Sequence, residues 1–157
     1  TDPFSFDTLF KPASNIDKFR CGTPGVLSYI ALESSLDIFE MVDMHAIRTK
    51  SKRLTTLFVD LIESLCEGYS LQLASPRDSS QRGSQVSFSH SHGWPIMQAL
   101  IAHGVIGDFR APNLLRFGFA PLYTRYEDVW LAASMLAHIL ETECWKDPVY
   151  ATPKLVT

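Results

Sequence analysis

The sequence contains few cysteines, and their arrangement excludes the usual cysteine-based sites. Cys21, Cys66 and Cys144 are odd in number, far apart and without a Cys-x-x-Cys spacing. A disulfide framework needs paired cysteines and a zinc knuckle needs closely spaced ones, so neither is indicated. Thiols of this kind suit a reducing compartment, and we expect the protein to be cytoplasmic.

Long apolar runs and an excess of one charge are also missing. No apolar stretch approaches the roughly 20 residues that span a bilayer, and the first residues lack a basic segment followed by an apolar one. The formal net charge is -3 and the pI is about 5.9, which gives no general attraction for nucleic acids or anionic membranes. We therefore expect neither partner. The chain starts at Thr1 without Met, which favours a fragment or a processed product.

Strong catalytic and metal-binding motifs are missing too. The chain has no Gly-x-Ser-x-Gly elbow, no glycine-rich phosphate loop and no His-Glu-x-x-His pattern. His90 and His92 lie two residues apart, which on a strand places both rings on one face, a spacing that some metal sites use. No neighbouring cysteine or carboxylate completes a ligand set, so we predict no metal site. These motifs alone indicate no more than a soluble folded domain.

The periodicity of apolar residues predicts an α+β fold. Apolar positions at spacings of three and four indicate a helix over 43–67 that ends at Gly68, and Thr124 with Glu127 has the residue types of a capping box. The remaining predicted elements are a helix from Thr23 to about Val42, strands over 70–74 and 85–90, a helix over 94–103, strands over 105–109 and 114–119, and a last helix from the capping box. This order predicts a small, mostly antiparallel sheet covered by helices.

The chain divides into three predicted regions. Residues 1–21 carry prolines and aromatic residues without a period, which predicts an extended arm that lies either on a partner or on its own domain. Residues 22–144 hold the predicted helices and strands of one domain. Residues 145–157 contain two prolines and no period, and we predict a flexible tail there.

One arginine stands out because of its surroundings. Arg116 lies among apolar and aromatic residues just before Gly118 and Pro121, where a short strand should end at the edge of a site. A guanidinium withdrawn from water needs an anionic partner, because an unpaired buried charge is costly. The residues leave two partners open, a structural carboxylate or a ligand.

A second candidate for anion binding is the predicted helix start at Thr23. Threonine is a good N-cap, and Pro24 would suit the first helical position. The free backbone donors at such a helix start often hold a phosphate or a carboxylate. Thr23 is therefore interpreted either as a simple cap or as part of an anion site.

Six segments, taken together, resemble the kynureninase family. They are Phe-Arg-Cys-Gly-Thr-Pro at 19–24, Leu-Asp-Ile-Phe at 36–39, Asp-Met-His-Ala-Ile-Arg-Thr-Lys-Ser at 43–51, Arg-Gly-Ser-Gln at 82–85, Gly-Val-Ile-Gly-Asp-Phe-Arg at 104–110 and Leu-Arg-Phe-Gly-Phe-Ala-Pro-Leu-Tyr at 115–123. The resemblance runs from about Phe4 to Leu140. The fourth and sixth segments are specific enough to set kynureninase above other relatives of the aspartate aminotransferase fold.

The resemblance implies a pyridoxal-phosphate enzyme that hydrolyses the Cβ–Cγ bond of L-kynurenine to anthranilate and L-alanine. Such enzymes act as homodimers in tryptophan degradation. This chain resembles the C-terminal small domain with a preceding long interdomain helix, and the arm would lead from the protein's own N-terminal large domain. The resemblance assigns Arg116 to the substrate α-carboxylate. It assigns Thr23, which is Asn in some members, to the cofactor near its phosphate, from the neighbouring subunit.

The chemical half of such a site does not occur in this sequence. The family's Schiff-base lysine, in a Tyr-Lys-Tyr-Leu context, and the aspartate on the pyridine nitrogen match nothing here. We therefore predict no catalytic residue in this chain, no activity of the chain alone and no retention of pyridoxal phosphate by it. The alternatives are a stand-alone interaction module with the same fold, or a fragment of another aminotransferase-fold enzyme. A preference for kynurenine or 3-hydroxykynurenine stays open.

Overall fold

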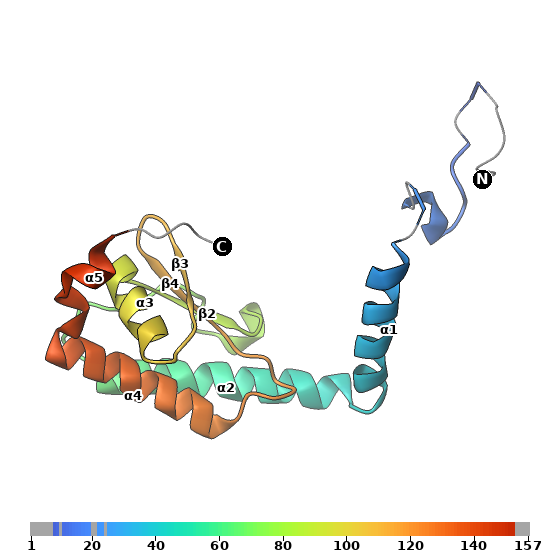
Figure 1. Ribbon diagram of the computed structural model, residues 1–157. Coiled ribbons are helices and arrows are strands. Elements are labelled where there is room, and N and C mark those ends of the chain that lie inside the picture. Colours follow the sequence, from blue (N-terminus) through green and yellow to red (C-terminus); the bar gives the residue numbers. More distant parts are fainter. Residues whose placement is uncertain (1–7, 10, 20–21, 24, 153–157) are drawn as a thin grey trace. The chain divides into compact units, whose positions relative to one another are not determined.

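The computed structural model describes residues 8–9, 11–19, 22–23 and 25–152. The chain separates into two compact units, Thr1–Asp43 and Met44–Thr157, which are described one at a time. The sequence instead predicts a boundary between residues 21 and 22, and that division into an arm, a domain and a tail stays a prediction. Figure 1 shows the elements of both units.

The first unit consists of a short 3-10 helix, η1 (Ile16–Phe19), and one α-helix, α1 (Val26–Glu40). Gly25 is the N-cap of α1, with extended backbone angles and no side-chain hydrogen bond. The prediction that Thr23 caps this helix was therefore wrong, because the extended backbone continues through Gly25 and the helix starts only at Val26. The predicted role of Pro24 falls outside the described residues. No residue of α1 is buried.

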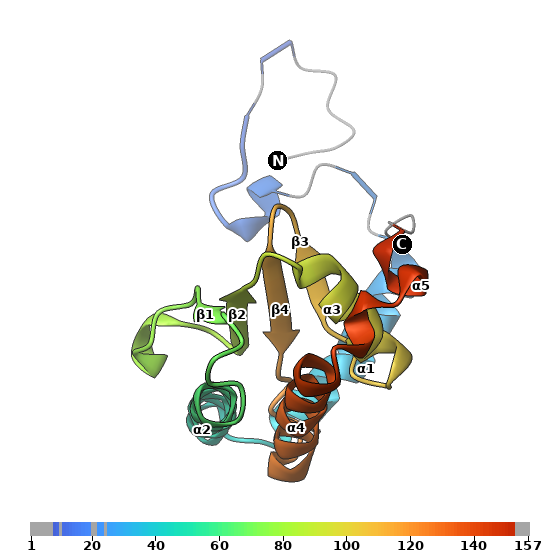
Figure 2. The same ribbon diagram turned by 90° about the vertical axis from the view of Figure 1, so that its left-hand side faces the viewer.

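The second unit contains a four-stranded antiparallel sheet with the order β1-β2-β4-β3. The strands are β1 (Gln72–Leu73), β2 (Gln85–Ser89), β3 (Asp108–Arg110) and β4 (Leu114–Gly118). β1 and β2 form the predicted hairpin, with a wide connection that holds the 3-10 helix η2 (Ser79–Gln81). The α+β prediction is confirmed, and Figure 2 shows the strands side by side.

Three helices pack around the apolar side of this sheet. They are α2 (Met44–Leu65), α3 (Gly93–Ala102) and α4 (Tyr126–Thr142). The glycines that end α2 and α3, Gly68 and Gly104, have φ values of +88° and +86°, a conformation that glycine adopts at no steric cost. These two helix ends agree with the sequence prediction.

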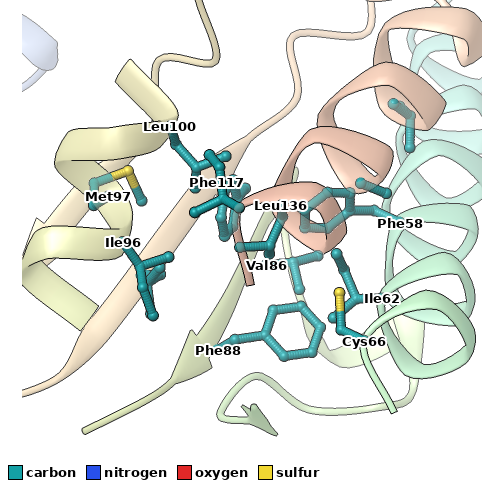
Figure 3. Close-up of a cluster of buried hydrophobic side chains, with 14 of the residues drawn as sticks. Phe58, Ile62, Cys66, Val86, Phe88, Ile96, Met97, Leu100, Phe117 and Leu136 are labelled. Carbon is teal, nitrogen blue, oxygen red and sulfur yellow. The ribbon is translucent and has the colours of Figure 1, made fainter. Parts of the chain in front are cut away.

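The core lies where α2, α3 and α4 meet strands β2 and β4 (Figure 3). The ring of Phe58 on α2 is fully buried and lies 6.1 Å from Phe88, 4.9 Å from Phe117 and 5.0 Å from Phe119, measured between ring centroids. Edge and tilted contacts at these distances add to the stabilisation from burial. The core therefore forms between elements that are distant in sequence, and it holds the sheet against the helices.

The capping box of α4 occurs one residue later than predicted. Arg125 is the N-cap, and its backbone N–H donates to the carboxylate of Asp128 at 2.8 Å. Thr124 instead donates its N–H to the carbonyl of Ala120 at 2.9 Å, which makes it part of the preceding turn. The prediction of Thr124 and Glu127 was therefore wrong by one position.

The chain continues as ordered structure after α4. A 3-10 helix, η3 (Cys144–Lys146), and a short helix, α5 (Pro148–Ala151), follow, and Trp145 and Tyr150 pack against the core. The sequence predicts a flexible tail from residue 145, whereas the structure has these two short helices up to residue 151, with two aromatic side chains against the core. Residues 153–157 lie outside the described part of the chain. In the described residues, no helix has the length and apolar character that crossing a membrane requires.

Candidate anion-binding site on the polar face of the sheet

The alternation of β4 gives the sheet one apolar and one polar face. Leu115 and Phe117 point into the core, so Arg116 between them points to the opposite face. The register places Ser87 of β2 opposite Arg116 on one side and Asp108 of β3 opposite it on the other. These three polar residues therefore form a row across three neighbouring strands.

Asp108 is the direct partner of Arg116. Nη2 of Arg116 donates to Oδ2 of Asp108, and Nε of Arg110 lies 3.2 Å from the same oxygen. The hydrogen bond from Arg116, with the added charge of Arg110, holds the pKa of the Asp108 carboxyl below its ordinary value, so Asp108 is ionised at neutral pH. Of the two partners that the sequence left open, the structure supplies a carboxylate.

The ion pair with Asp108 does not neutralise all of the positive charge around Arg116. Two guanidiniums share one carboxylate, which leaves one unit of positive charge among these three side chains. The Arg116 side chain is 29% exposed, and its buried Nε has no hydrogen-bond partner among the described residues. A buried donor without a partner costs about 1–3 kcal/mol. The exposed part of the guanidinium, with the surplus positive charge beside it, is the part that a further anion could approach.

The segment Arg-Gly-Ser-Gln at 82–85 leads into the strand beside Arg116. Gln85 donates from Nε2 to Oγ of Ser87 at 3.2 Å, on the same face as Arg116. Arg82 is only 7% exposed and donates to the carbonyls of Pro76 and Arg77 at 2.7 and 2.5 Å. Burial lowers the pKa of Arg82.

A second arginine, Arg48 on α2, also donates hydrogen bonds to the β1–β2 connection. Nη2 of Arg48 donates to the carbonyls of Ser79 and Arg82, both at 2.9 Å. Carbonyl oxygens in an irregular connection need donors when they leave water. The two arginines therefore hold the β1–β2 connection in place, and β2 with it.

Asp108 and Arg110 are two residues of this site that were not predicted from the sequence. The predicted strands, 105–109 and 114–119, leave a turn at 110–113, which would pair Asp108 with Leu115. In the structure β3 extends to Arg110, so Arg110 pairs with Leu114 and Asp108 with Arg116. Thr23 lies exposed in the first unit and Arg116 in the second.

His90 and His92 adopt a different arrangement from the one predicted. β2 ends at Ser89, and the backbone N–H of His92 donates to Nδ1 of His90 at 3.0 Å. The ring of His92 stacks on Trp145, with 4.8 Å between centroids, and a hollow of about 310 Å³ lies beside these rings. Within the described residues, no group of three His, Cys, Asp or Glu side chains could hold a metal.

Pyridoxal phosphate, which the resemblance implies, needs a lysine amine free to form a Schiff base. Lys146 lines the hollow, but its Nζ lies 2.6 Å from Oε1 of Glu143 and its side chain is 54% exposed. An ammonium held in an ion pair at the surface is a poor nucleophile. The other described lysines, Lys11, Lys18, Lys50 and Lys52, lie at exposed or half-buried positions. None of the described lysines therefore lies in an enclosed site that fits the cofactor.

Comparison with known proteins places this chain in a family. Residues 47–136 match the family model for the kynureninase C-terminal domain. The kynureninases of Burkholderia mallei (strain SAVP1) and Burkholderia pseudomallei (strain K96243) are 54% identical over 155 residues, which is 99% of this chain and 37% of those proteins. The kynureninase of Pseudomonas fluorescens is 41% identical over 154 residues, 98% of this chain and 37% of that protein. This chain belongs to the kynureninase C-terminal domain family.

Proposed function

We propose that this chain is the carboxylate-binding part of a kynureninase, a hydrolase that cleaves the Cβ–Cγ bond of L-kynurenine or 3-hydroxykynurenine to release L-alanine. The observation that carries the proposal is Arg116 on the polar face, half-buried, with surplus positive charge around it. A substrate α-carboxylate offers two oxygens, which match the fork of a guanidinium. Family membership supports the choice of substrate.

The chain spans 37% of the length of its kynureninase relatives. We propose that an N-terminal large domain supplies the Schiff-base lysine and holds pyridoxal phosphate, the group that provides the electron sink of the reaction. The chain alone should then be inert and should not retain the cofactor. A cytoplasmic location of the whole protein remains part of the same proposal.

The first unit supports a larger assembly. The helix α1 exposes apolar residues on all sides, among them Leu27, Ile30 and Leu36, which are 83%, 52% and 52% exposed. A helix that is apolar all round is normally covered by protein. We propose that the large domain and a second subunit of a homodimer cover α1, and that Thr23 contacts the cofactor near its phosphate across that dimer.

Adding pyridoxal phosphate to the purified chain tests the absence of the catalytic lysine. We expect no visible internal-aldimine band and no specific adduct after borohydride reduction and peptide mapping. Free L-lysine with the same cofactor is the positive control for aldimine formation. A stoichiometric adduct on one lysine of the chain would contradict the proposal.

The second candidate function is a stand-alone interaction module, which the exposed surface of α1 favours. The DNA upstream of Thr1 separates the two candidates. A continuous reading frame that encodes a Tyr-Lys-Tyr-Leu element supports the enzyme, whereas a stop codon followed by a native start supports the module.

A further inference from the structure

The positions of Asp108 and Arg116 are fixed by backbone pairing. They are register partners on β3 and β4, and Arg110 pairs with Leu114 at the hairpin end. Figure 2 shows these two strands as neighbours in the sheet. Side chains of directly opposed residues start about 4.5–5.5 Å apart on the same face. The carboxylate of Asp108 therefore has a fixed origin beside the long, flexible side chain of Arg116.

Arg110 anchors the carboxylate from its own strand. It lies two residues after Asp108, so both side chains point to the same face, and its Nε is 3.2 Å from Oδ2 of Asp108. This second contact has two effects. It restricts the Asp108 side chain, and it compensates the negative charge that would otherwise cancel the charge of Arg116.

We propose that Asp108 is a positioning residue that holds the guanidinium of Arg116 in the orientation that receives a substrate carboxylate, and that Arg110 supplies the compensating charge. The inference rests on the proposed function for its ligand, but the orientation of Arg116 is a property of the ligand-free chain. Once a carboxylate binds, two guanidiniums face two carboxylates, and the charges balance. Pre-organising a flexible arginine in this way lowers the entropy cost of binding.

A competing role for Asp108 makes the opposite prediction. If its carboxylate occupied the place of the substrate carboxylate, then removing its charge would strengthen substrate binding. Under the positioning role, Asp108→Asn weakens binding, because the amide loses the charge-assisted hydrogen bond that orients Arg116. The sign of the effect therefore separates the two roles.

The ligand-free test uses the Nε–Hε resonance of Arg116 in the 157-residue chain labelled with ¹⁵N. We expect a broad or shifted resonance, typical of a restricted arginine, that moves in Asp108→Asn to the position and narrow line of exposed arginines. Asp108→Glu should keep part of the restriction. The control is Glu63→Gln, which removes the partner of Arg77 on the surface and should leave Arg116 unchanged. An unchanged Arg116 resonance in Asp108→Asn would overturn the proposal.

The kinetic test uses the complete enzyme that contains this chain. Asp108→Asn should raise the KM for L-kynurenine about tenfold, with a smaller effect on kcat. In free energy, this increase lies near the lower end of the range for a hydrogen bond to a charged group. With Arg116→Lys already present, Asp108→Asn should raise the KM little further, because the lysine has no guanidinium to orient. Fully additive effects, or a lower KM in Asp108→Asn, would contradict positioning.

A failure of the proposed carboxylate site and a failure of the positioning role would give different results. If Arg116→Lys leaves the KM unchanged, the proposed carboxylate site is wrong, while the resonance of the ligand-free chain still decides whether Asp108 orients Arg116. Should Asp108→Asn not fold, Asp108→Glu and Arg110→Gln take its place. In Arg110→Gln the Arg116 resonance should keep most of its restriction, because its own hydrogen bond to Asp108 remains. A complete loss of the restriction in this variant would show that Asp108 alone does not orient Arg116.

Discussion

The indole of Trp145 stacks on the imidazole of His92, with 4.8 Å between ring centroids and 28° between their planes. His92 is the N-cap of α3, and Trp145 belongs to η3, more than fifty residues later in the sequence. This contact therefore fastens the C-terminal segment to the start of a core helix.

Removing the indole should destabilise the second unit. We expect Trp145→Ala to lower the free energy of unfolding by about 1–2 kcal/mol, less than the 3–5 kcal/mol typical of a fully buried aromatic, because Trp145 is only partly buried. Urea denaturation of the chain measures the change. The matched control is Trp130→Ala, at a side chain that is 53% exposed, which should change stability by less than about 0.5 kcal/mol.

The histidine beside this contact predicts a pH dependence of stability. Burial, followed by the nearby charge of His92, lowers the pKa of His90, while a backbone hydrogen bond with Tyr69 acts in the opposite direction. As the pH falls below about 6.5, His90 is therefore protonated in the unfolded chain before it is protonated in the folded chain. The contribution of neutral His90 to stability is therefore complete above this pH. It is lost as the pH falls toward the lower pKa that His90 has in the folded chain.

Unfolding measured between pH 7.5 and 5 should show this loss, and His90→Asn should reduce its slope. The asparagine oxygen can still accept the N–H of His92, which His90 accepts through Nδ1. The other titratable groups around the hollow are His92, Glu143, Lys146 and Tyr69, and all are kept in this variant. His138→Asn, at an exposed position of α4, is the control and should leave the slope unchanged. An equal slope in His90→Asn would assign the pH dependence to another group.

The helices and strands of the second unit were predictable because their signals are local. The apolar stripe of α2 and the glycines after α2 and α3 depend on residues within a few positions of each other. The family resemblance, confirmed by the comparisons, rests on similar short segments. Local patterns in the sequence were therefore sufficient to predict both the fold class and the family.

The errors arose where contacts between distant residues, or a shift of one or two positions, decide the structure. Nothing near Trp145 in the sequence reveals His92 as its partner, so the segment after α4 was predicted to lack order. Thr23 had the residue type of a helix cap, but Gly25 took that place. The predicted turn at 110–113 would pair Asp108 with Leu115, so the predicted strands do not reveal Asp108 as the partner of Arg116.

A buried arginine offers a test of the β1–β2 connection. Arg82→Met keeps most of the apolar stem but removes the donors to the carbonyls of Pro76 and Arg77. We expect a loss of about 2–3 kcal/mol in the free energy of unfolding, and faster amide hydrogen exchange within 75–84. Arg77→Met is the control, because Arg77 is 66% exposed and its ion pair with Glu63 lies at the surface, where such pairs contribute little. Equal stabilities of the two variants would show that Arg82 does not hold the connection.

Arg116 carries the central claim, and the KM for L-kynurenine of the complete enzyme with Arg116→Lys tests it most directly. Lysine keeps the charge but cannot form the two parallel hydrogen bonds of a guanidinium, so we expect a loss of about 2 kcal/mol, which is about a 30-fold higher KM. Arg125→Lys, at an exposed arginine, should leave the KM unchanged. A higher KM in Arg116→Lys alone supports the carboxylate site, and an unchanged KM would contradict it.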